Sequence, residues 1–160
     1  LISNKKNKKI TMKKNKILLT AVLSLLTLAS ISCSKDGKEC AKDVAGSYNG
    51  TLVMSVSGTN YGTFDMVVDV KSTSDDQVSM TIPAFGEGHM AMPELTVTNV
   101  DVDKDGSTYT LKKDQFTITV NEVPYKGSIN GTVKDGKLTF TSPVTPGAMP
   151  MAVDLNFTTK

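Results

Sequence analysis

From Gly46 onward, apolar and polar residues alternate along the chain, as they do in β-strands with one buried face. The apolar positions fall into nine runs: Tyr48/Leu52/Met54/Val56, Phe64/Met66/Val68/Val70, Val78/Met80/Ile82, Leu95/Val97, Tyr109/Leu111, Phe116/Ile118/Val120, Ile129/Val133, Leu138/Phe140 and Val153/Leu155/Phe157. The residues between them are mostly Thr, Ser, Asn, Asp and Lys. Each strand is therefore expected to bury one face and expose the other to water.

Turn residues separate these runs. Hairpins are predicted at 57–60, 74–76, 103–106 and 134–137, and the Asp135-Gly136 pair favours a type I′ turn. Within the strand that starts at Glu94 the apolar residues change parity, which predicts a β-bulge near Asn99. Gly50, Gly127 and Gly131 lie on the inward parity, where a barrel bends or a backbone approaches closely.

The strand pattern predicts an all-β domain over residues 44–160. No apolar stripe of helical period follows residue 45. Eight or nine short antiparallel strands can bury their apolar faces in a closed up-and-down barrel, which also removes exposed sheet edges. A two-sheet sandwich is the alternative.

The N-terminal segment is typical of an export signal. Residues 12–32 combine a basic start, an apolar stretch from Ile17 to Leu28 and a small-residue zone. Residues 1–11 precede the plausible initiator Met12 and are interpreted as a leader or an over-extended start. Residues 33–43 are polar and are expected to form a linker.

The stretch from Leu28 to Cys33 resembles the lipobox of bacterial lipoproteins, with Ser30 standing where that pattern prefers Leu. The resemblance implies cleavage before Cys33, lipidation of its sulfur and acylation of the new N-terminus. Several acyl chains on one residue give stable membrane anchoring. Lipidation would leave Cys40 without a partner in the chain; the alternative is a Cys33–Cys40 disulfide in an unlipidated protein.

Charge excludes one class of partner. Residues 1–32 hold seven of the 18 Lys and no acidic residue, so the remainder carries 11 Lys against 16 Asp and Glu, a net charge of −5. An acidic domain does not favour nucleic-acid binding, which needs a positive face. The chain has no Arg, so it cannot form the bidentate clamp that usually recognises carboxylates or phosphates.

Several segments resemble the calycin-like β-barrel domain of lipid-anchored envelope proteins from gut Gram-negative bacteria, which are related to lipocalins. They are Val44–Leu52, the Ile82–Gly86 turn with its Met-rich continuation to Pro93, and the strands Gly127–Val133 and Gly136–Phe140. The resemblance implies a small barrel in the cell envelope, anchored to the outer membrane with a periplasmic or surface face. It suggests a small ligand without identifying one.

We expect such a ligand to be mainly apolar or neutral and to bind in the barrel or at its mouth. Met-rich segments suit an adaptable apolar pocket. The candidate ligand-binding residues are Tyr48, Met54, Phe64, Met66, Phe85, His89, Met90, Met92, Tyr109, Tyr125, Met149 and Met151. A filled barrel would instead indicate a structural or interaction lipoprotein, whose protein partners the sequence does not identify.

Metal sites are weaker hypotheses. His89 with Met90, Met92, Met149 and Met151 could form a soft site for Cu(I) if the two Met segments met. Asp101, Asp103, Asp105 and Gly106 have the opening spacing of a calcium loop, but Lys112 occupies the twelfth position, so a hairpin turn is the better interpretation. We expect neither a metal nor a cofactor.

No catalytic motif accompanies these residues. The chain has one His, no Gly-x-Ser-x-Gly elbow and no His-Glu-x-x-His motif. We therefore expect a binding protein and not an enzyme.

Overall fold

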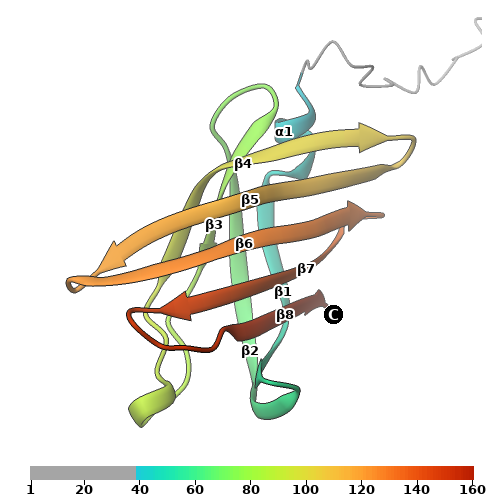
Figure 1. The fold of residues 1–160 in the computed structure, drawn as a ribbon. Helices are drawn as coiled ribbons and strands as arrows, with labels where there is room; N and C mark the ends of the chain where they lie inside the picture. The colour runs from blue at the N-terminus through green and yellow to red at the C-terminus, as the bar shows by residue number, and fades with distance from the viewer. Residues whose placement is uncertain (1–38) are drawn as a thin grey trace, which may run out of the picture. The chain divides into compact units, whose positions relative to one another are not determined.

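The computed structural model describes residues 39–160, which form a closed eight-stranded barrel in which every neighbouring pair of strands is antiparallel (Figure 1). The elements are α1 (Cys40–Val44), β1 (Gly46–Val56), β2 (Thr59–Ser72), β3 (Gln77–Ile82), the 3₁₀-helix η1 (Gly88–Met90), β4 (Leu95–Asp105), β5 (Thr108–Val120), β6 (Val123–Lys134), β7 (Lys137–Pro146) and β8 (Val153–Thr159). The all-β up-and-down barrel predicted from the alternation is confirmed. The export signal, its leader and the start of the linker lie outside the described residues.

The barrel has eight strands because two of the predicted strands are parts of a single strand. The runs at Tyr109/Leu111 and Phe116/Ile118/Val120 both belong to β5, whose register with β6 shifts between Lys113 and Phe116. Four consecutive polar residues, Lys112 to Gln115, interrupt the alternation there and give the appearance of a turn. The strand instead continues through a bulge.

Two-residue turns close three of the hairpins. Both central residues have positive φ at Ser57-Gly58, at Asp135-Gly136 and at Asn121-Glu122, as a type I′ turn requires. The first two were predicted from sequence. The third was not, because glutamate carries no turn signal. The predicted bulge is confirmed: Asn99 has φ 54° and lies between Val97 and Val100, where the register with β3 shifts.

The interior of the barrel is filled. Inward side chains from every strand, with those of α1, form one buried apolar cluster, and Leu52, Leu111, Leu138 and Leu155 are each 0% exposed. The rings of Phe140 and Phe157 stack with their centroids 5.3 Å apart. Burying each such side chain stabilises the fold by about 1.5–3 kcal/mol.

Close approach explains the inward glycines. A Cβ on Gly50 would lie 2.4 Å from the backbone oxygen of Thr158, and one on Gly127 would lie 2.5 Å from that of Pro143. A Cβ on Gly131 would lie 2.9 Å from the Cβ of Phe140. These positions require glycine because the strand next to each leaves no room for a side chain.

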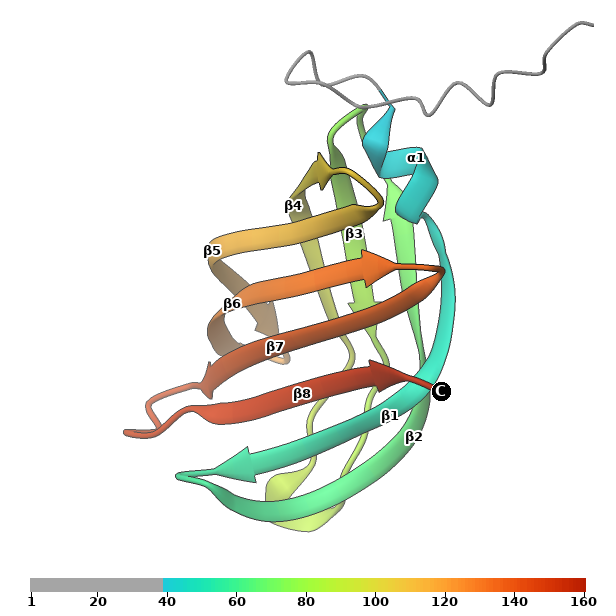
Figure 2. The ribbon, with the colours of Figure 1, turned by 90° about the vertical axis from the view of Figure 1, so that its right-hand side faces the viewer.

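Helix α1 covers one end of the barrel, here called the α1 end (Figure 2). Cys40, Ala41 and Val44 are at most 3% exposed, and the Tyr48 hydroxyl donates a 2.7 Å hydrogen bond to the Val44 carbonyl. The last residues of the expected linker are therefore packed against the barrel. No helix within residues 39–160 is long and apolar enough to cross a membrane.

The opposite end, here called the loop end, carries the connections β1–β2, β3–β4, β5–β6 and β7–β8. The two longest of these connections span residues 83–94 and 147–152. They contain the His89 and Met segments noted in the sequence.

Candidate functional site

Half of the twelve predicted ligand-binding residues lie in the filled interior. Tyr48, Met54, Met66, Phe85, Met92 and Tyr125 are each at most 9% exposed and belong to the central apolar cluster. Burial also raises the pKa of the Tyr48 hydroxyl above its ordinary value. These side chains pack against one another and hold the barrel together.

Three more are partly buried. Phe64 and Met90 pack against the core, and the Phe64 ring lies against that of Phe85 with centroids 5.2 Å apart. Tyr109 lies elsewhere: its hydroxyl donates to the Asp43 carboxylate of α1, so it belongs to the α1 end. The structure therefore separates Tyr109 from the Met segments.

The remaining three, His89, Met149 and Met151, are exposed, the two Met residues at 43% and 48%. Val123, in the neighbouring β5–β6 hairpin, is 38% exposed. Val123, Met149 and Met151 together are called the apolar rim.

Short contacts hold the loop that carries this rim. The Gly147 amide donates to the Pro124 carbonyl at 2.7 Å, and the Ser57 hydroxyl lies 3.6 Å from the Met151 sulfur. The β7–β8 loop thus joins the β5–β6 hairpin to the β1–β2 turn. Across the barrel end, Phe85 and Met92 exchange two backbone hydrogen bonds of 3.0 and 2.8 Å, which close the loop around η1 and His89.

The soft-metal candidates differ in exposure. Met92 is buried in the core, whereas Met149 and Met151 are exposed on another loop. Within residues 39–160 no group of three or more His, Cys, Asp or Glu side chains could hold a metal ion. Asp101, Asp103 and Asp105 lie along β4, paired with β5 up to the turn at Gly106, so the hairpin interpretation is confirmed.

Cys40 is buried and disulfide-bonded. The chain contains one other cysteine, Cys33, which lies outside the described residues. The thiol at Cys40 expected from a lipidated Cys33 is thus not the state seen in the structure.

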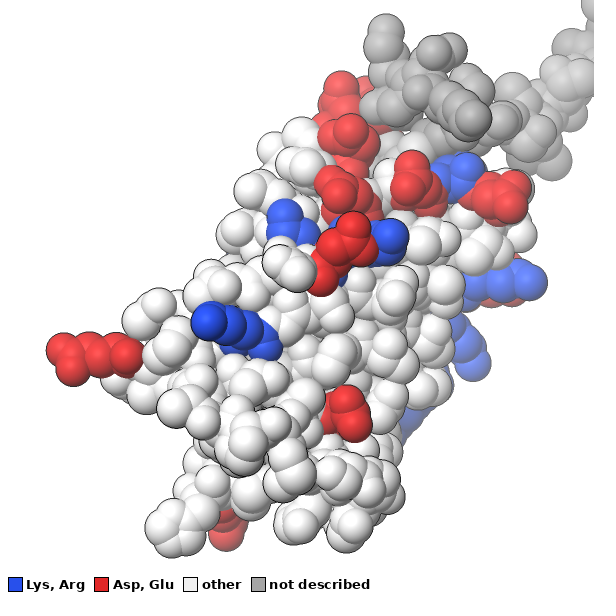
Figure 3. Space-filling view, in the orientation of Figure 1, with Lys and Arg blue, Asp and Glu red and all other residues white. Residues whose placement is uncertain are grey.

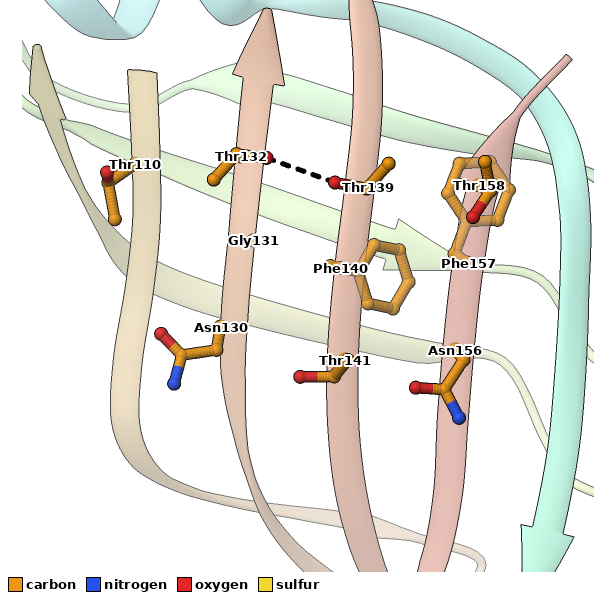
Figure 4. A pocket seen from close by; sticks show the side chains of 10 residues that line it. All are labelled: Thr110, Asn130, Gly131, Thr132, Thr139, Phe140, Thr141, Asn156, Phe157 and Thr158. Atoms are coloured by element: carbon orange, nitrogen blue, oxygen red, sulfur yellow. Dashed lines mark hydrogen bonds between the residues drawn. The ribbon is translucent and has the colours of Figure 1, made fainter. Parts of the chain in front are cut away.

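A hollow of about 300 Å³ on the outer face of β5 to β8 was not predicted (Figure 4). Its lining residues are Thr110, Asn130, Gly131, Thr132, Thr139, Phe140, Thr141, Asn156, Phe157 and Thr158. Phe140 and Phe157 point inward and are at most 3% exposed, so the outward side chains are all threonine or asparagine. We call this surface the Thr/Asn face.

Strand register orders these side chains in two rows. One row runs Thr110, Thr132, Thr139 and Thr158 across four strands; the other runs Asn130, Thr141 and Asn156. The hydroxyls of Thr132 and Thr139 are 3.0 Å apart and share a hydrogen bond. In the sequence these residues stand at the polar positions of the alternation, which predicted a water-exposed face but no binding site.

A second hollow, of about 400 Å³, lies further along β6 and β7. Its lining residues are Asp114, Gln115, Phe116, Thr117, Lys126, Gly127, Ser128, Pro143 and Thr145. It continues the outward ladder of the same two strands toward the loop end.

Comparison with known proteins shows which structures and which family this barrel resembles. One similar solved structure is that of a "putative outer membrane protein" from Bacteroides fragilis NCTC 9343, with 29% sequence identity and a TM-score of 0.67. The match covers 76% of this chain and 52% of that one, so this chain spans about half of its neighbour. No match was found among curated proteins. The pattern of the Calycin-like beta-barrel domain family matches residues 44–160, most of the chain and the whole barrel, and the chain therefore belongs to that family.

Proposed function

We propose that this chain is a lipid-anchored, non-enzymatic binding protein of the cell envelope that takes a small, mainly apolar ligand at the apolar rim of its loop end. The observation that carries the ligand site is the exposure of Met149 and Met151 beside Val123 on a barrel whose interior is filled.

The anchor is supported by the lipobox-like residues that end at Cys33 and by the envelope description of the B. fragilis neighbour. Six residue steps separate Cys33 from Glu39, where the described part begins, and they span at most about 21 Å when fully extended. An anchor at Cys33 would therefore hold the α1 end close to the bilayer. The apolar rim at the opposite end would face the aqueous space, where a ligand can reach it.

The rim has the chemistry of an adaptable binding surface. Methionine side chains are flexible and polarizable, so they fit apolar partners of different shapes. Three exposed apolar side chains from two adjacent connections form a site small enough for a small molecule. The backbone contacts of Gly147 with Pro124 hold the two connections in place.

Binding without catalysis is supported by the side chains around the rim. The loop-end His89 is exposed, and its imidazole makes no hydrogen bond to another side chain within residues 39–160. In nucleophilic catalysis the base lies within hydrogen-bond reach of the nucleophile that it activates.

The anchor is tested by the intact mass of the protein extracted from membranes. Lipidation uses the sulfur of Cys33, so the anchored form and a form with a disulfide at Cys33 are exclusive, and their masses differ. We expect an acylated N-terminal cysteine, and release into the soluble fraction for Cys33→Ser. An unacylated mature chain in the membrane fraction would contradict the anchor.

The ligand site is tested by native mass spectrometry of the full chain, with the wild type compared with Met149→Gln/Met151→Gln. We expect a co-purified small molecule in the wild type and at least a tenfold lower occupancy in the variant. Thr96→Gln/Thr98→Gln on the outer face of β4 is the matched control. Equal occupancy in all three proteins would exclude the rim.

The filled interior supports a second candidate function, a lipoprotein that acts on other proteins through its outer surface. In that case the purified barrel carries no small molecule, and cross-linking in intact cells captures the same envelope protein in repeated experiments.

A further inference from the structure

We propose that the Thr/Asn face binds a neutral glycan chain along β6 and β7. This site is separate from the apolar rim and does not depend on it. It is built on the outward side chains of four paired strands, and its occupant follows from their chemistry.

Charge decides the class of ligand. No Lys, Asp or Glu lines the first hollow, although 21% of the chain is charged. Figure 3 shows most of the acidic residues on this side gathered near the α1 end, and mainly uncharged side chains with a few isolated charges, lysine among them, over β6, β7 and β8. The nearest charged neighbour by register is Lys112, the cross-strand partner of Asn130, and its ammonium is paired with the Asp114 carboxylate at 3.0 Å. A phosphate or carboxylate ligand would therefore find no cation in the hollow and an already paired one beside it, and a cationic ligand would find no carboxylate in the hollow. A neutral ligand needs neither kind of charged partner, so the uncharged hollow favours it.

The available hydrogen-bonding groups point to a polyhydroxylated ligand. The side chains of Thr110, Asn130, Thr141, Asn156 and Thr158 make no hydrogen bond to other residues within 39–160. Each asparagine amide offers two hydrogen-bond donors and an acceptor, and each threonine hydroxyl can act as a donor and as an acceptor. Sugar hydroxyls are also both donors and acceptors, so every group on the face can find a partner.

Threonine adds an apolar element to this surface. Each Thr side chain presents a methyl group beside its hydroxyl, and sugar rings likewise present C–H groups beside hydroxyls. Five threonines line the hollow, from all four strands. The face thus offers alternating polar and apolar contacts, as a sugar ring does.

The face is held rigid before a ligand arrives. The backbone pairs β5 with β6, β6 with β7, and β7 with β8 behind both rows, and the stacked rings of Phe140 and Phe157 support it from inside. A site on paired strands loses little conformational entropy when it binds.

The second hollow indicates a chain of sugars rather than a single one. On β6 the outward side chains Thr132, Asn130, Ser128 and Lys126 connect the two hollows, with Thr139, Thr141, Pro143 and Thr145 beside them on β7. Six residue steps along a strand correspond to roughly 20 Å. Lys126 ends this track, and Asp114 lies beside the track in the β5 bulge, paired with Lys112 at 3.0 Å.

The test is isothermal titration of the full chain with neutral hexasaccharides of glucose, mannose and xylose at millimolar concentrations. A galacturonic acid hexamer and a glucosamine hexamer serve as charged probes. The variants are Asn130→Ala/Asn156→Ala in the Thr/Asn face, Thr98→Ala on the outer face of β4 as the matched control, and Met149→Gln/Met151→Gln in the rim. Circular dichroism confirms that each variant is folded.

We expect saturable binding of at least one neutral hexasaccharide, at least tenfold weaker in Asn130→Ala/Asn156→Ala and unchanged in the Thr98 and rim variants. Three results overturn the proposal: no binding of any neutral hexasaccharide, equal affinity in the Asn130/Asn156 variant, or tighter binding of a charged hexamer. Loss of binding in the rim variant alone would assign the glycan to the rim and also overturn the proposal.

Discussion

The hydroxyl of Tyr109 donates a 2.8 Å hydrogen bond to the carboxylate of Asp43 and so joins β5 to α1. Lys104 completes this contact: its ammonium lies 3.7 Å from the same carboxylate and 4.8 Å from the centre of the Tyr109 ring. The hydrogen bond to Tyr109 is the main cause that raises the Lys104 pKa. Three residues thus fix α1 over its end of the barrel.

Removing this hydrogen bond should loosen α1. We expect Tyr109→Phe to lower the free energy of unfolding by about 1 kcal/mol, the usual net contribution of one hydrogen bond. Amide exchange of Ala41 should also become faster. Urea unfolding and hydrogen exchange measure the two effects. Tyr61→Phe is the matched control, because Tyr61 is 54% exposed; an equal loss in both variants would contradict a specific role for Tyr109.

Gly50 should not tolerate a side chain. Its Cβ would lie 2.4 Å from a backbone oxygen of β8, which cannot move without breaking the β1–β8 pairing. We expect Gly50→Ala to destabilise the barrel by about 3 kcal/mol, in the range of strongly disruptive core changes. Gly46→Ala, with nothing within 4 Å of its Cβ, is the control. Thermal unfolding compares the two, and similar melting temperatures would show that the closure is looser than described.

The Asn121-Glu122 turn offers a stabilising change. Glu122 has φ 67°, a conformation that a residue with a side chain adopts at a cost, whereas glycine adopts it freely. Glu122→Gly should therefore raise the free energy of unfolding by about 0.5–1 kcal/mol. Gly136→Ala, at the matching position of the Asp135-Gly136 turn with φ 73°, should do the reverse. A lower melting temperature for Glu122→Gly would contradict the type I′ assignment.

Acid should weaken one exposed contact between β2 and the residue after β8. Hydrogen bonds from Lys160 and Thr51 lower the pKa of Asp65 below its ordinary value. Because the folded-state pKa is the lower one, the contribution is present above the ordinary aspartate pKa of about 4 and disappears as the pH falls through the folded-state value. Asp65→Asn should therefore lose less stability than the wild type between neutral and acidic pH. Urea unfolding at both pH values tests this, and Lys160→Met should reduce the pH dependence in the same way; equal curves for all three proteins would contradict it.

The alternation of apolar and polar residues predicts most of the fold, because each strand buries one face. The strands, the Asn99 bulge and the inward position of the glycines all follow from which residues fall on the buried side. Residues 112–115 are misleading because parity cannot distinguish a bulge from a turn. Helix α1 is missed because five residues form too short a stripe to recognise, and its burial depends on contacts with distant strands. The Thr/Asn face is missed for a related reason: which outward residues become neighbours depends on the register of four strands.

The claim that the interior is filled and that ligands bind at the surface is tested most directly by titrating the barrel with the neutral apolar fluorophore N-phenyl-1-naphthylamine. The Met149→Gln/Met151→Gln rim variant is compared with Met54→Gln, whose side chain in the wild type is 1% exposed. We predict that the rim variant loses most of the fluorescence increase while remaining as stable as the wild type, and that Met54→Gln destabilises the barrel without weakening binding in the molecules that stay folded. Unchanged binding in the rim variant together with loss in folded Met54→Gln would place the ligand inside the barrel and contradict the account.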